Sequence, residues 1–73
     1  MNTMNNIVGE RIRNMRKSLG LNQQQLVEML LGSGIVMQVC TLCKIELGHR
    51  QVSDIELKAF ADALQTSISS FFG

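Results

Sequence analysis

The sequence predicts a compact all-α fold, and three observations support this. Apolar residues recur at helical spacing in four segments, capping residues and glycines stand at the ends of these segments, and no segment alternates in the manner of a strand. The 73 residues, 45% hydrophobic and 18% charged, suffice for one small core and leave no room for a second. We therefore expect a single domain over residues 1–73.

Two helices are predicted in the first half of the chain. The first covers about residues 6–19 and ends before Gly20, a residue type that commonly follows a helix. Its apolar stripe consists of Val8, Ile12, Met15 and Leu19. The second covers about residues 22–31, because Asn22 with Gln25 forms a capping box and two glycines follow within "GSG" at 32–34.

In the second half of the chain, helices are predicted at about residues 38–47 and 54–64, followed by one short helical turn capped by Ser67. Gly48 ends the 38–47 segment, and Ser53 with Glu56 forms a capping box before the next helix. On the 38–47 segment Leu42 and Ile45 point inward. At about 100° per residue, this turns Cys40, Cys43, Lys44 and Leu47 outward and places Val39 and Thr41 on the flanks.

Charge is distributed unevenly along the chain, although the formal net charge is only +1. Residues 1–50 hold six of the seven Lys and Arg residues, whereas residues 51–73 hold three of the six acidic residues. Any surface that binds a polyanion is therefore expected in the first two-thirds of the chain. No apolar run approaches the roughly 20 residues of a membrane span, and no leader pattern is seen, so we expect a cytoplasmic protein with no membrane contact.

The two cysteines, Cys40 and Cys43, raise three interpretations. A zinc site is disfavoured, because His49 is the only further nitrogen or sulfur ligand and structural zinc takes four ligands. A redox-sensing thiol and a cysteine that merely replaces serine both stay open. Catalysis is not expected, since the chain has one histidine and no phosphate-binding glycine loop after a strand. We expect no enzyme activity, no metal and no cofactor.

Several separated motifs resemble one known family. "VGERIRNMRKSLGLNQQQL", "LCKIELGHR", "SDIELKAFADAL" and "SISSFF" follow one another over roughly residues 7–72. They resemble the Cro and lambda-repressor type of helix-turn-helix DNA-binding domain. This resemblance implies a compact five-helix domain, in which the 22–31 and 38–47 helices form the helix-turn-helix and the 38–47 helix enters the major groove of double-stranded DNA.

The resemblance also implies roles for particular residues. Positions that touch base edges in the family are matched here by Val39, Cys40 and Lys44, and positions where phosphate or base contacts are common are matched by Gln38 and Thr41. Of these five residues, Lys44 is the strong donor, able to reach guanine or a phosphate. Sequence readout is therefore expected to be partly apolar.

Gln23 and Arg50 match phosphate-contacting positions of the family, and a solvated side chain is the alternative at each. Arg16 and Glu46 match a partly buried ion pair that joins the first and third helices. Helical spacing agrees with such a pair, because each residue lies beside the apolar stripe of its own helix. Two unconnected surface charges are the alternative.

The chain departs from the family pattern at two places. The connection within "LLGSGIVMQ" is longer than the usual turn of about 3–4 residues, as in an extended helix-turn-helix. The start of the 38–47 helix also carries Val39 and Cys40, where the family usually has Ser, Arg, Gln or Asn.

The expected function is that of a sequence-specific transcriptional regulator, most simply a repressor, that binds a near-palindromic operator as a homodimer. A second apolar stripe on the 54–64 helix, formed by Ile55, Ala59 and Ala63, together with the terminal "SFFG" is the predicted dimer surface. The alternative is an antitoxin-like or regulatory module whose partner is another protein, bound through Val39, Leu47 and Ile55.

Overall fold

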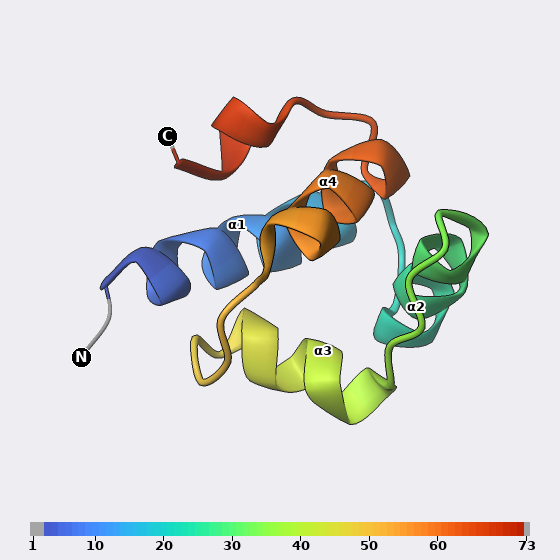
Figure 1. The fold of residues 1–73 in the computed structure, drawn as a ribbon, viewed down its shortest axis with the longest axis horizontal. Coiled ribbons are helices and arrows are strands. Elements are labelled where there is room, and N and C mark those ends of the chain that lie inside the picture. Colours follow the sequence, from blue (N-terminus) through green and yellow to red (C-terminus); the bar gives the residue numbers. More distant parts are fainter. Residues whose placement is uncertain (1–2, 73) are drawn as a thin grey trace.

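The computed structural model describes the backbone of residues 3–72 and the side chains of residues 7–71. Over this range it contains no strand, and the all-α prediction is confirmed (Figure 1). The elements are α1 (Thr3–Ser18), α2 (Gln23–Gly32), α3 (Val39–Glu46), α4 (Asp54–Ala63) and the 3-10 helix η1 (Ile68–Phe72). The last predicted helical turn is thus a 3-10 helix, and α1 begins earlier than predicted.

Local hydrogen bonds define where the helices begin and end. At the start of α2, Asn22 Oδ1 accepts from the Gln25 N–H at 2.7 Å, and Gln25 Oε1 accepts from the Asn22 N–H at 2.8 Å. Ser53 and Glu56 form the same reciprocal pair before α4. After α1, Gly20 adopts a φ of +73°, which lets the Leu21 N–H reach the Arg16 carbonyl at 3.1 Å.

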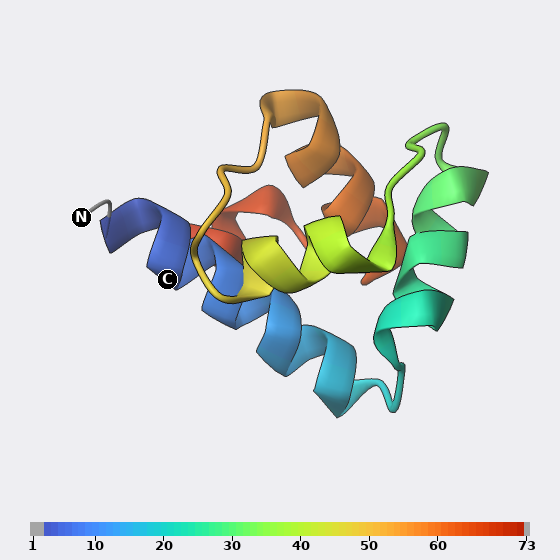
Figure 2. The same cartoon turned by 90° about the horizontal axis from the view of Figure 1, so that it is seen from below.

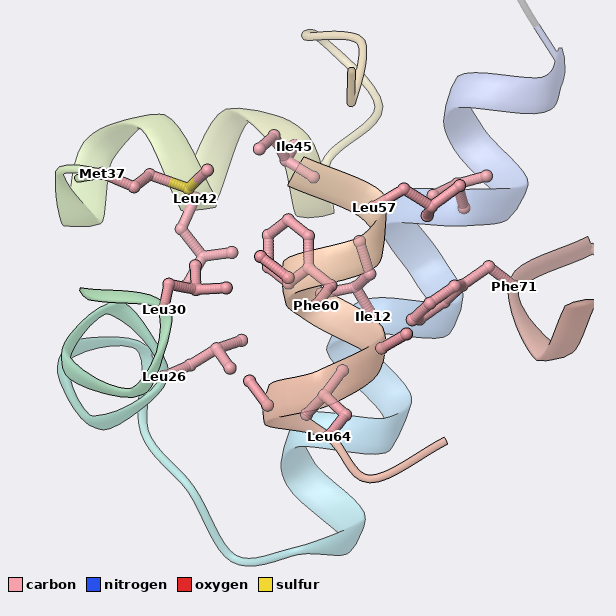
Figure 3. Packing of buried hydrophobic residues seen from close by; sticks show 14 residues of the cluster. Ile12, Leu26, Leu30, Met37, Leu42, Ile45, Leu57, Phe60, Leu64 and Phe71 are labelled. Atoms are coloured by element: carbon pink, nitrogen blue, oxygen red, sulfur yellow. The ribbon is translucent and has the colours of Figure 1, made fainter. Parts of the chain in front are cut away.

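The core gathers side chains from every element around Phe60 of α4 (Figure 3). Seven side chains are almost fully buried: Ile12, Leu26, Leu30, Leu42, Ile45, Phe60 and Phe71. Burying each large apolar side chain contributes about 1.5–3 kcal/mol, so this cluster supplies most of the stability of so short a chain.

Packing between the elements leaves α3 at the surface. α1 packs against α3 and η1, and α2 packs against α3 and α4. α3 forms the lower edge of the molecule in Figure 1 and crosses its front in Figure 2. Gly9 is buried where α1 meets α3, and a Cβ at this position would collide with the Ile45 carbonyl oxygen. Helical periodicity gave no indication of this close contact.

Two expectations about burial are wrong. Leu19, assigned to the inward stripe of α1, follows the last residue of that helix and is exposed. Ala59 and Ala63, assigned to an exposed stripe, are only 4% and 7% exposed and belong to the core, because α4 contacts both α2 and η1. The predicted dimer surface therefore lacks its continuous stripe, with Ile55 alone at 72% exposure. In its "SFFG" part Phe71 is also buried, while the Phe72 side chain and Gly73 lie outside the described residues.

None of the helices over residues 3–72 combines the length and the apolar character that crossing a membrane requires.

Candidate functional site

The exposed face of α3 is the first part of the candidate site. Leu42 and Ile45 are fully buried and fasten the helix to the core. Cys40 and Lys44 are exposed, as expected from the helical periodicity, and Val39 and Thr41 are half-buried on the flanks. Because the anchoring residues and the exposed residues occupy opposite sides, α3 presents one row of side chains to solvent.

Cys43 does not fit the outward row as predicted. It is half-buried, whereas Cys40 is exposed, and both thiols are free. Within the described residues, no three His, Cys, Asp or Glu side chains are grouped so as to hold a metal ion.

The beginning of α3 offers polar groups that no helix cap uses. Gln38 is the N-cap residue, yet its side chain makes no capping hydrogen bond. Its Oε1 instead accepts from the Cys40 thiol at 3.5 Å, a weak interaction between two exposed side chains. The amide of Gln38 and the thiol of Cys40 therefore stand together at the helix end and keep hydrogen-bonding capacity for a ligand.

A buried ion pair ties α3 to α1. Arg16 Nε donates to Glu46 Oε2 at 2.8 Å, and Arg16 Nη2 donates to Glu46 Oε1 at 3.1 Å. The side chains are 9% and 3% exposed, and Arg16 Nη1 also donates to the Leu21 carbonyl at 2.8 Å. These are the two residues for which the resemblance implied a pair. The two parallel bonds fix both the distance and the orientation of the two helices.

Gln23, in the first turn of α2, joins the same network. Its Nε2 donates to Glu46 Oε1 at 3.1 Å, so Glu46 accepts hydrogen bonds from both α1 and α2. The network therefore holds the start of α2 next to the end of α3. The second amide hydrogen and the Oε1 of Gln23 make no hydrogen bond within the described residues, and its side chain is half-buried. Gln23 can bind an external group only from this restrained position.

Arg50, for which the resemblance implies a phosphate contact, lies in the loop after α3 and pairs with Glu56 of α4. Its Nη1 and Nη2 donate to the two carboxylate oxygens of Glu56, each at 3.0 Å, and Nη1 also donates to the Gln51 carbonyl at 3.1 Å. Nothing in the sequence indicated this pair, because Glu56 was already assigned to the capping box with Ser53. The carboxylate both pairs with Arg50 and takes part in the capping box, since Glu56 Oε1 also accepts from the Ser53 N–H.

The electrostatics of Glu56 follow from these contacts. Burial alone would raise its pKa, but the hydrogen bonds from Arg50 and Ser53 and the charge of Arg50 outweigh that effect, so the pKa of Glu56 is lowered. The Arg50 side chain is 39% exposed, which leaves part of the guanidinium accessible. A phosphate approaching Arg50 would share it with Glu56.

A hollow of about 290 Å³ adjoins the ion-pair network. Its walls come from α1, the start of α2 and the end of α3. The lining residues are Arg13, Arg16, Lys17, Gln23, Cys43, Glu46 and Leu47. Arg13 and Lys17 are exposed, so two cations without an assigned role border the same region as the predicted site residues.

No family model matches this sequence, and no curated protein matches it.

Proposed function

We propose that this protein binds double-stranded DNA in a sequence-dependent manner and regulates transcription, with α3 in the major groove. The observation that carries this proposal is the two-sided character of α3. Leu42 and Ile45 hold one side in the core, while Cys40 and Lys44 stand on the other side at the surface. This is the arrangement that a recognition helix requires, and the connection of residues 33–38 from α2 is longer than the usual turn of about 3–4 residues, as in an extended helix-turn-helix.

The dimensions of α3 suit this role. An α-helix with its side chains is about 10–12 Å across, and the major groove of B-DNA is about 12 Å wide. Lys44 donates to guanine O6 and N7 or to a phosphate in this proposal, whereas Val39 and the Cys40 thiol pack against thymine methyl groups. Gln38 and Thr41 lie near enough to the exposed row to contact bases or phosphates.

Backbone contacts are assigned to the two neighbouring segments. Gln23 lies in the first turn of α2, where the helix dipole and unpaired N–H groups favour an anion. Arg50 lies in the loop after α3 and keeps accessible area despite its pair with Glu56. In this proposal both residues position α3 without reading sequence, as phosphate contacts generally do.

The proposal includes a homodimer on a near-palindromic operator, with the two α3 helices about 34–36 Å apart, and repression as the simplest outcome. The α4 stripe is no longer part of it, since Ala59 and Ala63 are buried. The dimer must use another surface. Sedimentation with and without duplex tests this part directly, and only monomers at micromolar concentration would contradict it.

A second candidate is a module that binds another protein. Apolar side chains at the surface favour it, because Leu47 and Ile55 are exposed and Val39 is half-buried. Salt separates the two candidates. DNA affinity should fall by orders of magnitude between about 50 and 200 mM salt, whereas an apolar protein contact should change little.

The test begins with selection of bound duplexes from a randomised pool, followed by a salt titration on the selected sequence. Lys44→Ala should relax the preference at one base pair of each half-site and cost about 1–3 kcal/mol. Gln23→Ala should weaken selected and random duplexes alike. Lys58→Ala is the matched control, because Lys58 is an exposed lysine on α4, a helix to which the proposal assigns no DNA contact. Equal losses from Lys44→Ala and Lys58→Ala would contradict the role of α3.

A further inference from the structure

We propose that Arg13 and Lys17 of α1 hold backbone phosphates of the DNA beside α3. This inference rests on the proposed function and extends the interface to a third helix. The sequence suggests only solubility charges at these positions, because they lie one turn apart on the exposed side of α1. Their position in the fold places them where a phosphate of bound DNA could reach them.

The placement of the two cations is the first argument. Arg13 and Lys17 line the hollow of about 290 Å³ together with Gln23, Cys43 and Leu47. The hollow therefore lies between α1 and the part of the surface formed by the start of α2 and the end of α3. A duplex that receives α3 in its major groove brings one of the flanking phosphate backbones along this side.

The local charge is the second argument. The hollow has three cations, and only Arg16 has its charge offset, by Glu46 at 2.8 Å. Within the described residues, no ion pair involves Arg13 or Lys17. Two positive charges thus border the hollow without an ion pair in the described part of the chain, and Glu10, one turn before Arg13 on α1, lines the other hollow of this helix.

The opposite side of α1 shows that this charge excess is local. Arg11 and Glu10 line a different hollow, of about 650 Å³, which α1 forms with residues 64–66. There a carboxylate accompanies the cation, and none of the α3 residues takes part. Arg11 is therefore a cation of the same helix and similar exposure that faces away from the candidate interface.

The orientation of Arg13 and Lys17 is fixed by elements that the interface already uses. The Arg16–Glu46 pair fastens the same turn of α1 to α3, because Arg16 follows Arg13 by three positions and precedes Lys17 by one. A phosphate held by these two side chains is consequently in a constant relation to Lys44 and Gln23. The two cations add affinity and register without sequence preference.

The experiment measures duplex affinity against salt for the double variant Arg13→Gln/Lys17→Gln. Each lost phosphate contact should reduce the slope of log K against log salt by about 0.9, so the variant should lose about 1.8. Between about 50 and 200 mM salt, the wild type should then weaken about tenfold more than the variant. Selected and random duplexes should show the same change.

The matched control is Arg11→Gln/Lys58→Gln, which removes the same charge from exposed positions of α1 and α4. It should keep a slope near that of the wild type. The exchange Arg13→Lys/Lys17→Arg preserves charge and should restore the slope, which excludes loss of folding as the cause. If the wild type binds duplex with a steep slope and both charge-removing variants change it equally, this inference is overturned while the proposed function stands. If the wild type does not bind duplex at all, both are overturned.

Discussion

Removal of the Glu46 carboxylate is the sharpest test of how this fold is held together. In Glu46→Ala, Arg16 Nε and Nη2 lose their acceptors and the guanidinium keeps only the Leu21 carbonyl. The Arg16 side chain is 9% exposed, so water cannot replace the lost carboxylate without rearrangement of the structure. Breaking a buried pair by removing one partner costs about 3–5 kcal/mol.

This loss is large for a chain of 73 residues. At about 0.05–0.15 kcal/mol per residue, the total free energy of unfolding is about 4–11 kcal/mol. Glu46→Ala should therefore remove between about a quarter and all of it. At about 4–8 °C for each kcal/mol in a domain of this size, the melting temperature should fall by at least about 12 °C.

Urea denaturation followed by far-ultraviolet circular dichroism measures the change. Glu28→Ala is the control, because Glu28 is an exposed glutamate of α2 with no ion pair among the described residues, and it should stay within about 0.5 kcal/mol of wild type. The double variant Arg16→Met/Glu46→Leu should recover most of the loss, since no charge is then left buried and unpaired. If Glu46→Ala costs no more than Glu28→Ala, the network does not hold α1, α2 and α3 together.

Two further predictions concern packing and pH. Gly9→Ala should destabilise the fold by about 1–3 kcal/mol, because the added methyl group meets the Ile45 carbonyl oxygen where α1 crosses α3. Gly32→Ala is the control and should be neutral or stabilising, because the space around Gly32 is open. Equal melting temperatures of the two variants would contradict this prediction. The lowered pKa of Glu56 means that its contribution to stability is complete above the ordinary glutamate value of about 4.5 and is lost as the pH falls through the lower value. Glu56→Gln should therefore lose less stability than wild type between about pH 6 and pH 3 in urea titrations, and an identical loss would show that the Arg50 pair has no such effect.

Several features of the fold could be predicted from short stretches of sequence. The starts of α2 and α4 follow from Asn22 with Gln25 and from Ser53 with Glu56, because both capping boxes join residues three apart. The inward side of α3 likewise follows from the spacing of Leu42 and Ile45. These features depend on backbone geometry within one or two turns, which the order of residues largely determines.

Other features depend on which elements meet, and periodicity could not reveal them. Ala59 and Ala63 share one side of α4 with exposed Ile55, but α2 and η1 cover α4 on more sides than one apolar stripe suggests. Arg50 binds Glu56 because the loop between α3 and α4 brings its guanidinium back to the first turn of α4, six residues further along the chain.

The sequence by itself determined that the chain is helical, where α2 and α4 start, and which side of α3 is buried. Only the tertiary structure decided that Gly9 sits against the Ile45 backbone and that Arg13 and Lys17 border a hollow shared with α2 and α3. The physical reason is the range of the interactions. Caps and periodicity act between residues three or four positions apart, whereas close packing and the field around a charge depend on neighbours brought together from distant parts of the chain.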